Sequence, residues 1–261
     1  MIKFFRKIRQ NLLSEGKTGK YLKYAIGEII LVVIGILIAL QINNWNQNQK
    51  DRELGINYLN RITIDIKKDT IILNQKNNLA DKLTKGYLDF IREMYKKQES
   101  KEEFIKLMSS VEFNVDDLIL TDIAYSELVN TGNLDLIYDD NLRNQITDYY
   151  RYYEFVASRV NELNKSNLTQ ISTLARAWPN MKYVLQGYMG ILPENIFVKD
   201  NYMYNNDEWA LINNPSSMEF RLQENVMYFY YMKQVILKPM FIVLNSKANN
   251  LLDSIRKELT E

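Results

Sequence analysis

Two residue types are missing from this chain of 261 residues: it has no cysteine and no histidine. Without cysteine there is no disulfide, no thiolate metal site and no thiol nucleophile. Without histidine the chain lacks the commonest general base, the commonest zinc ligand and every Ser-His arrangement. Carboxylate, lysine and tyrosine chemistry survive, but acidic pairs such as Asp116-Asp117 are typical of helix starts and solvated surface. We therefore expect no enzyme, no metal site and no cofactor.

Basic residues are concentrated at the start of the chain. Residues 1–23 hold seven basic side chains and one acid, whereas the remainder holds 26 basic and 31 acidic side chains. The formal net charge of +1 therefore hides a basic N-terminal part and a mildly acidic remainder. Because the acidic part has no run of Lys and Arg with interleaved aromatics, we expect no nucleic-acid partner.

One long apolar run follows the basic segment. Residues 24–42, YAIGEIILVVIGILIALQI, are interrupted only by Glu28 and Gln41. A helix over this run is about 28 Å long, close to the roughly 30 Å hydrocarbon core of a bilayer. We predict a transmembrane helix over residues 24–45, with Trp45 as an anchor at the membrane interface.

Two other interpretations of the run are a buried core helix and a cleaved signal peptide. Residues 29–40 have no polar side chain on any face, which favours lipid over an amphipathic core position. The sequence after Ala39 lacks a small-x-small cleavage site, which favours a retained anchor. Since cations flanking a span stay in the cytoplasm, we expect residues 1–23 inside and residues 46–261 in the periplasm.

The basic segment has its own amphipathic pattern. At 100° per residue its apolar side chains share one face and its cations the other, which is typical of a helix lying in the headgroup plane. The apolar residues of this predicted interfacial anchor are Phe4, Phe5, Ile8 and Leu12. The alternative is a disordered basic tail, because a helix of about twelve residues is marginal without a membrane.

Within the predicted span, an acid and two small residues share one stripe. On a helix Val32, Gly35, Ala39 and Ile42 fall within about 40° of Glu28. Small residues let helices approach closely, and ionisable residues in spans usually face protein or water. The stripe is therefore a candidate helix-packing face. The alternative is that Glu28 reaches the headgroups or pairs with Lys20 or Lys23.

The residues beyond the span predict an all-α, up-down helical bundle. Apolar side chains recur every seven residues over a predicted helix at 51–97, with Leu59, Ile66, Leu73, Ala80, Tyr87 and Met94 partnered by Ile62, Leu83 and Phe90. Ser100 with Glu103 predicts the start of the next helix, and Gly132 predicts the end of a later one. Asp139 or Asp140 starts a third helix that runs to about Ala177.

A fourth helix is predicted from near Ser216, with Pro239 as a kink or break. Its predicted core positions are Leu222, Val226, Phe229, Ile236, Val243, Leu244, Leu251 and Ile255. The aromatic cluster Tyr149, Tyr150, Tyr152, Tyr153 and Phe155, with Tyr228–Tyr231, is interpreted as core rather than as a binding cage.

The stretch 178–215 is a predicted cap at the membrane-distal end of the bundle. It holds three of the four prolines and two of the three tryptophans. We interpret Trp178, Pro179 and Trp209 as a candidate partner surface, with the alternative that the tryptophans fill the bundle end.

The start MIKFFRKIRQNLLSEGKTGKYLKYAIGEIILVVIGILIALQINNWN resembles an uncharacterised, domain-of-unknown-function family of small single-span inner-membrane proteins from Bacteroidota. The resemblance is strong over residues 1 to about 70, where Gly27-Glu28, Gly35, Ala39 and Trp45 carry it. It continues more weakly through Ala124-Tyr125, Leu128, Thr131–Leu134 and Leu142–Tyr150. The resemblance implies an inner-membrane location in a Gram-negative envelope and supplies no activity.

Two function classes fit these observations. The first is a membrane-anchored scaffold or binding module that self-associates or holds a partner protein. The second is a sensor or transport accessory subunit that signals through its single span to a separate membrane partner. The seam on residues 59–94 favours the first class.

Overall fold

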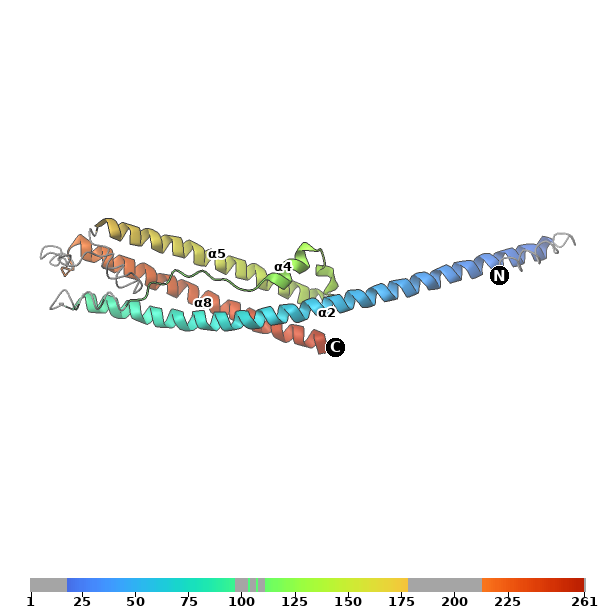
Figure 1. Cartoon of the computed structure of the whole chain (residues 1–261), viewed down its shortest axis with the longest axis horizontal. Coiled ribbons are helices and arrows are strands. Elements are labelled where there is room, and N and C mark those ends of the chain that lie inside the picture. The colour runs from blue at the N-terminus through green and yellow to red at the C-terminus, as the bar shows by residue number, and fades with distance from the viewer. Residues whose placement is uncertain (1–17, 97–102, 104–106, 108–110, 178–212, 261) are drawn as a thin grey trace, which may run out of the picture. The chain divides into compact units, whose positions relative to one another are not determined.

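The computed structural model of the chain describes residues 18–96, 103, 107, 111–177 and 213–260. Its helices are α2 (Thr18–Met94), α4 (Ile123–Asn130), the short 3-10 helix η1 (Leu134–Leu136), α5 (Asp140–Ala177) and α8 (Met218–Thr260) (Figure 1). No strand occurs in these ranges, so the predicted all-α class is confirmed for the described residues. The chain divides into two compact units, residues 1–57 and residues 58–261.

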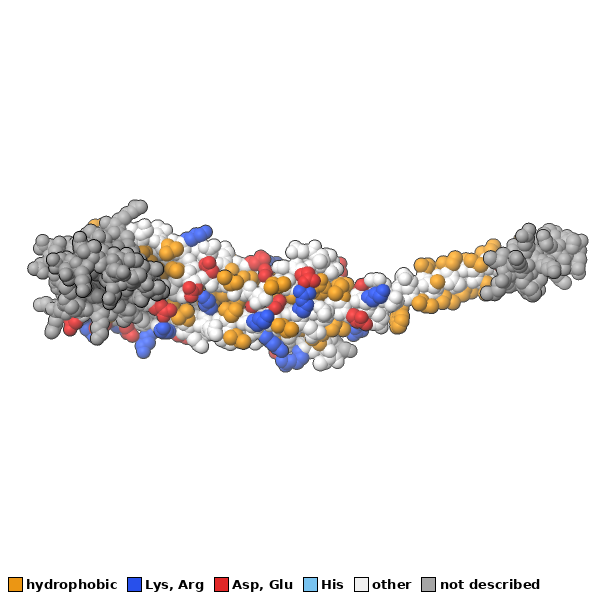
Figure 2. All heavy atoms as spheres, in the orientation of Figure 1, with side chains coloured by type: hydrophobic (Ala, Val, Ile, Leu, Met, Phe, Trp, Pro, Cys, Tyr) orange, Lys and Arg blue, Asp and Glu red, His pale blue; other side chains and the backbone are white. Residues whose placement is uncertain are grey.

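The first unit contains the apolar run, which is part of α2. Every residue from 29 to 50 is exposed. Figure 2 shows hydrophobic side chains along the apolar run on the face in view. Among the described residues this is the one helix long and apolar enough to cross a membrane, and a signal sequence near the N-terminus would meet the same criteria. The predicted interfacial residues Phe4, Phe5, Ile8 and Leu12 lie outside the described residues.

The second unit is built on three long helices. Side-chain bonds join Tyr95 to Glu224, Asp81 to Lys238 and Asn74 to Asn245, so residue numbers rise on α2 as they fall on α8. The same holds between α5 and α8, where Gln145 meets Ser254 and Asn164 meets Lys233. Helix α8 is therefore antiparallel to both α2 and α5 (Figure 1).

It follows that α2 and α5 run parallel to each other, as the first and third helices of the predicted up-down topology do. Two parallel neighbours require a return connection between them. That connection is the segment 111–130, which follows α2 in the opposite direction. Its contacts with α2 pair Glu112 with Tyr87, Thr121 with Asp69, and Glu127 with Arg61.

Most of this return leg is not a helix. Residues 111–121, which we name the strap, have no regular secondary structure, and only α4 forms the predicted helix that Gly132 ends. About 27 Å of helix separates Tyr87 from Asp69 at about 1.5 Å per residue, and the strap covers that length at about 3.3 Å per residue. The extended conformation therefore needs about half the residues that a returning helix would need. The predicted helix start at Ser100 lies outside the described residues.

The sequence of the strap explains its conformation. Residues 111–121 read VEFNVDDLILT, a run of β-branched, Asn and Asp residues that are poor helix formers. Leu118 and Leu120 are buried, whereas Ile119 between them is 75% exposed. This alternation is that of an extended chain with one face on a core.

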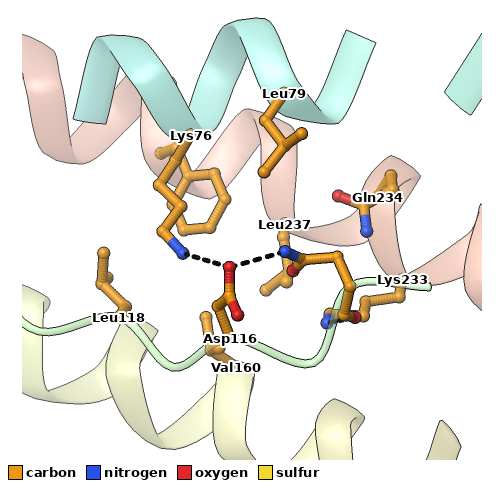
Figure 3. A pocket seen from close by; sticks show the side chains of 10 residues that line it. Lys76, Leu79, Asp116, Leu118, Val160, Lys233, Gln234 and Leu237 are labelled. Carbon is orange, nitrogen blue, oxygen red and sulfur yellow. Dashed lines mark hydrogen bonds and ion pairs between the residues drawn. The ribbon is translucent and has the colours of Figure 1, made fainter. Parts of the chain in front are cut away.

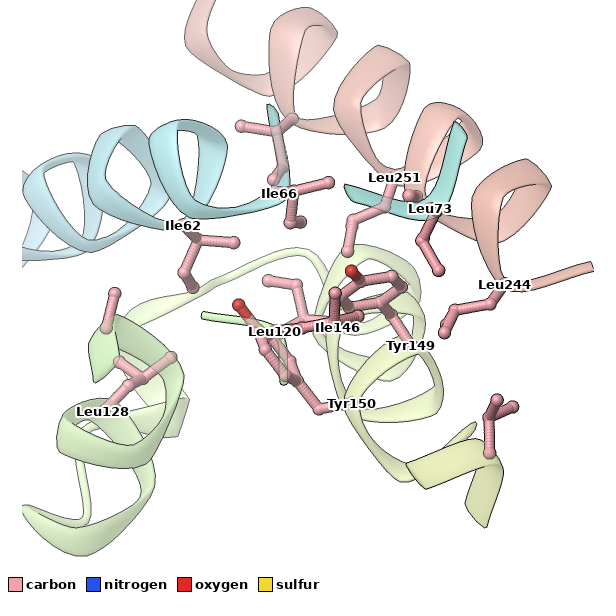
Figure 4. Close-up of a cluster of buried hydrophobic side chains, with 14 of the residues drawn as sticks. Ile62, Ile66, Leu73, Leu120, Leu128, Ile146, Tyr149, Tyr150, Leu244 and Leu251 are labelled. Carbon is pink, nitrogen blue, oxygen red and sulfur yellow. The ribbon is translucent and has the colours of Figure 1, made fainter. Parts of the chain in front are cut away.

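The core lies between the three long helices and the strap, in two clusters (Figure 4). All nine residues of the predicted seam are buried, namely Leu59, Ile62, Ile66, Leu73, Ala80, Leu83, Tyr87, Phe90 and Met94. Figure 4 shows Ile66 and Leu73 of α2 opposite Tyr149 of α5 and Leu251 of α8. Because these side chains are covered within one chain, the seam cannot also be the surface on which a second copy packs.

The helix ends follow the predicted capping residues. Asp139 Oδ1 accepts hydrogen bonds from the backbone N–H of Asn141 at 2.7 Å and of Leu142 at 3.2 Å, so Asp139 is the N-cap of α5. The Oγ of Ser217 accepts from the N–H of Phe220 at 3.1 Å at the start of α8. Helix α8 continues through Pro239, so this proline does not break it.

Gly132 ends α4 as predicted. Its φ is +71°, a backbone conformation that favours glycine. Its N–H donates to the carbonyl of Val129 at 3.0 Å, and the N–H of Asn133 donates to the carbonyl of Leu128 at 2.9 Å. This pair of bonds is the Schellman arrangement that satisfies the last carbonyls of a helix.

Two predicted core positions of the fourth helix are wrong. Phe229 and Val243 are exposed, because the face of α8 that packs inward carries Val226, Tyr230 and Leu237 instead. The aromatic cluster divides in the same way: Tyr149, Tyr150 and Tyr230 are buried, whereas Phe155 and Tyr228 are exposed.

Candidate functional site

The most distinctive site of the second unit is the groove between α2, α5 and α8 that holds the strap. Five helix side chains bond to main-chain atoms of the strap. They are Tyr87 to the carbonyl of Glu112 (2.6 Å), Lys233 to that of Asn114 (2.7 Å), Asn164 to that of Val115 (2.9 Å), Tyr153 to the N–H of Leu120 (3.3 Å) and Asp69 to the N–H of Thr121 (2.8 Å). All three long helices contribute, so the groove holds the strap by its backbone.

Lys233 is the centre of one end of the groove. Its side chain is only 2% exposed, and its ammonium donates to Asn114 O and to Asn164 Oδ1. The amide of Asn164 in turn donates to Val115 O and to Asp117 Oδ1 at 3.1 Å. A lysine on α8 and an asparagine on α5 thus hold four consecutive strap residues, 114 to 117, in a single hydrogen-bond network.

Burial changes the acidity of Lys233. Loss of solvent around the ammonium lowers the pKa of Lys233 from 10.5 to about 8, and repulsion from Lys76 acts in the same direction. Attraction to Asp116 and Asp117 opposes both effects. The strap therefore supplies the negative charge that helps to keep this amine protonated.

Asp69 is the centre of the other end. It is fully buried, and besides the N–H of Thr121 it accepts a hydrogen bond from the hydroxyl of Tyr149 at 2.9 Å. Burial raises the pKa of the Asp69 carboxyl, while the two donors oppose that shift. Burial next to Asp69 also raises the pKa of the Tyr149 hydroxyl. One turn earlier, Asp65 Oδ2 accepts from the N–H of Ala124 at 3.4 Å and so caps α4 from another helix.

A small cavity lies beneath the strap. Its volume is about 10 Å³, enough for one water-sized group. Figure 3 shows Lys76 of α2 facing Asp116 of the strap across it, with Gln234 and Lys233 of α8 beside it. Gln234 is 4% exposed, and its buried Nε2 has no hydrogen-bond partner among the described residues.

The end of the groove around Lys233 and the strap have opposite charges. Lys82 Nζ lies 2.9 Å from Glu112 Oε2, and Lys76 Nζ lies 3.9 Å from Asp116 Oδ2. These two cations of α2 and the buried ammonium of Lys233 on α8 contact the strap from two helices. The strap carries Glu112, Asp116 and Asp117 and no basic residue.

The site residues predicted from the sequence do not lie in this groove. In the first unit, Val32, Gly35, Ala39 and Ile42 are exposed and Glu28 is partly exposed, so the stripe on α2 is not covered within that unit. Trp45 is 65% exposed, as an interfacial anchor would be. The candidate partner surface of Trp178, Pro179 and Trp209 lies outside the described residues.

Sequence reasoning missed the groove, although a signal was present. Lys233 is three residues after Tyr230 and four before Leu237, which places a cation within the buried stripe of α8. Asp69 has the same relation to Ile66 and Leu73 on α2. A charged side chain at a core position needs a partner there. The strap supplies the carbonyl of Asn114 to Lys233 and the N–H of Thr121 to Asp69.

No group of three or more acidic side chains is placed to hold a metal ion within the described ranges. The expectations of no metal, no cofactor and no enzymatic activity therefore stay expectations.

The described features define an all-α protein with one apolar helix and a helical unit that holds an extended segment of its own chain. The chain belongs to a family of unknown function, DUF6090, whose model matches residues 28–185. That range includes most of the apolar run, the strap and all of α4 and α5. Neither the curated proteins nor the solved structures contain a match to this chain.

Proposed function

We propose that this protein is a membrane-anchored helical binding module of the periplasm, which self-associates or holds a partner protein. Residues 24–45 span the inner membrane, residues 1–23 stay in the cytoplasm, and the helical unit lies outside. The family resemblance to single-span inner-membrane proteins of Bacteroidota supports the same location.

One observation carries the proposal: the apolar run of α2 is exposed at every residue from 29 to 42. Ile29 and Leu37, for example, are 63% and 57% exposed. So large a continuous apolar surface is unfavourable in water and favourable in hydrocarbon. The seven cations before the run favour insertion with the N-terminus inside.

The binding role is supported by the polar groove of the second unit, which holds an extended segment by its main chain. Binding modules for other polypeptides recognise an extended main chain by hydrogen bonds in the same way. Residue types that usually perform catalysis, histidine and cysteine, do not occur in the sequence.

A second candidate function is a sensor or transport accessory subunit. The observation in its favour is that α2 continues as one helix from Thr18 to Met94, through the apolar run and into the seam. Such a helix would connect a change at the bundle to a separate membrane partner, since the chain shows no second run of this kind in its described residues.

Two measurements test the proposal. Alkaline phosphatase fused after Glu261 should be active, whereas a cytoplasmic reporter at the same point should be silent. The opposite pattern would reverse the orientation. Full-length protein extracted in mild detergent should then exceed the mass of one chain or carry a defined protein partner, and a lone monomer without a partner would refute the binding role.

A further inference from the structure

We propose that the groove between α2, α5 and α8 is a binding site for an extended acidic peptide, and that its ligand in trans is the strap of a second copy of this chain. The chain's own strap fills the site in cis. The proposal rests on the self-associating form of the proposed function, because exchange requires that copies of the chain meet.

The first argument is the way in which the strap is recognised. The groove bonds to main-chain atoms at five places along the strap. Leu118 and Leu120 insert buried side chains near its C-terminal end, and the partly buried Phe113 packs on Tyr230. Sites for extended peptides work in this way: main-chain hydrogen bonds provide affinity, and pockets for alternate side chains provide specificity. The ligand defined by the groove is therefore an extended segment with a Leu-x-Leu pattern.

The second argument is charge. Lys76 and Lys82 pair with acids of the strap, and Lys233 is buried against its carbonyls. An acidic segment satisfies these cations, whereas a basic one would leave Lys233 buried beside like charge. The two acids Asp116 and Asp117 directly precede the Leu-x-Leu pattern in the strap.

The third argument is that the strap can separate from the groove without unfolding the helices. It belongs to no helix or strand, and Glu112, Val115, Asp116, Asp117 and Ile119 are exposed along it. Segments with few buried apolar contacts open at a lower free energy than the global fold does. The helices would keep their own backbone hydrogen bonds when the strap leaves.

The groove also has a buried hydrogen-bond donor that the strap does not use. The Nε2 of Gln234 is buried at the cavity beneath the strap and has no partner among the described residues. The groove thus offers one more hydrogen-bond donor than the strap takes up in this arrangement. A segment seated slightly differently, as in exchange between copies, could use it.

A second copy is the ligand because each copy carries the one segment whose fit is established. Exchange of identical segments reproduces every contact and is a low-cost route to a dimer. The cis strap competes with a high effective concentration, so exchange needs copies held close together, as in one membrane.

Two complementary variants of the full-length chain test this. The strap variant carries Leu118→Ala and Leu120→Ala, which empties its groove. The groove variant carries Lys233→Met and Asn164→Leu, which frees its strap. With different tags on co-expressed copies, we expect at least fivefold more recovery of the strap variant with the groove variant than of either variant with itself.

The outcomes separate the two proposals. Equal recovery of all three pairs overturns strap exchange and leaves pairing through another face. No recovery of any pair overturns both exchange and self-association. Circular dichroism establishes that each variant keeps its helices, and Leu120→Ala and Lys233→Met as single changes replace a double variant that does not.

A synthetic peptide of residues 111–121 provides a second measurement. By fluorescence anisotropy we expect it to bind the folded strap variant at least tenfold more tightly than the wild type, in which the cis strap competes. A peptide with Leu118→Asp and Leu120→Asp should not bind, and a chain with Ile119→Ala should behave as wild type because Ile119 is exposed. A folded strap variant that does not bind the peptide overturns the proposal.

Discussion

Lys233 on α8 donates a hydrogen bond of 2.7 Å to the carbonyl oxygen of Asn114, a residue 119 positions earlier in the chain. The bond joins the last long helix to a segment that has no regular structure. It places an ionisable amine under the strap, where its protonation depends on the strap's carbonyls and acids. The stability of the second unit should therefore respond to the state of this one side chain.

The first prediction concerns pH. The folded-state pKa of Lys233 is lowered to about 8 from 10.5 in the unfolded chain, so between these values the unfolded chain holds the extra proton. Stability must then rise with pH in that window, by about 1–2 kcal/mol between pH 7 and 9.5. Denaturation of the wild type and of Lys233→Met measures this, and the variant should lack the rise. Above about pH 10 the unfolded tyrosines ionise and reverse the trend.

The second prediction concerns Asp69, which bonds to both the N–H of Thr121 and the hydroxyl of Tyr149. Asp69→Val should cost about 2–4 kcal/mol, because it leaves two buried donors without an acceptor. Asp69→Asn keeps an acceptor for Thr121 and should cost less. Equal losses for the two substitutions, measured by chemical denaturation, would show that the side chain matters only for its volume.

The third prediction uses two glycines as a matched pair. A Cβ on Gly132 or Gly86 would meet nothing within 4 Å, so space does not distinguish them. Gly132 has a φ of +71°, and Gly132→Ala should destabilise by about 1–2 kcal/mol. Gly86 lies inside α2, and Gly86→Ala should stabilise by about 0.5–1 kcal/mol. Thermal unfolding should shift in opposite directions, and shifts of one sign would contradict this account of Gly132.

The regular helices could be predicted because their signals are local. A seven-residue recurrence and its partner positions identified all nine buried seam residues of α2, and Asp139 and Gly132 mark helix ends where side-chain or backbone chemistry requires them. These features depend on residues three to seven positions apart. Periodicity alone is enough to find them.

The groove could not be found in this way, because its partners are far apart in sequence. Asn164 and Lys233 are 69 positions apart, and each alone reads as an ordinary polar residue of a helix. The strap was not predicted as an extended segment, because two-residue alternation extends only over Leu118 to Leu120. Its low helix propensity was the signal that the apolar pattern concealed.

The last prediction concerns the stripe of Glu28, Gly35 and Ala39 on α2. Gly35→Ile with Ala39→Ile should reduce cross-linked oligomers or recovery of a partner several-fold, because branched side chains keep neighbouring helices apart. No atom lies within 4 Å of a Cβ placed on Gly35, so the change does not disturb the chain that carries it. Glu28→Gln keeps hydrogen-bonding capacity and should weaken assembly less than Glu28→Leu. Leu37→Val, on the opposite side of the helix, is the control and should have no effect. Assembly that survives all of these changes would mean that the stripe faces lipid and that the acid of Glu28 reaches the headgroups, because no helix would then be packed on it.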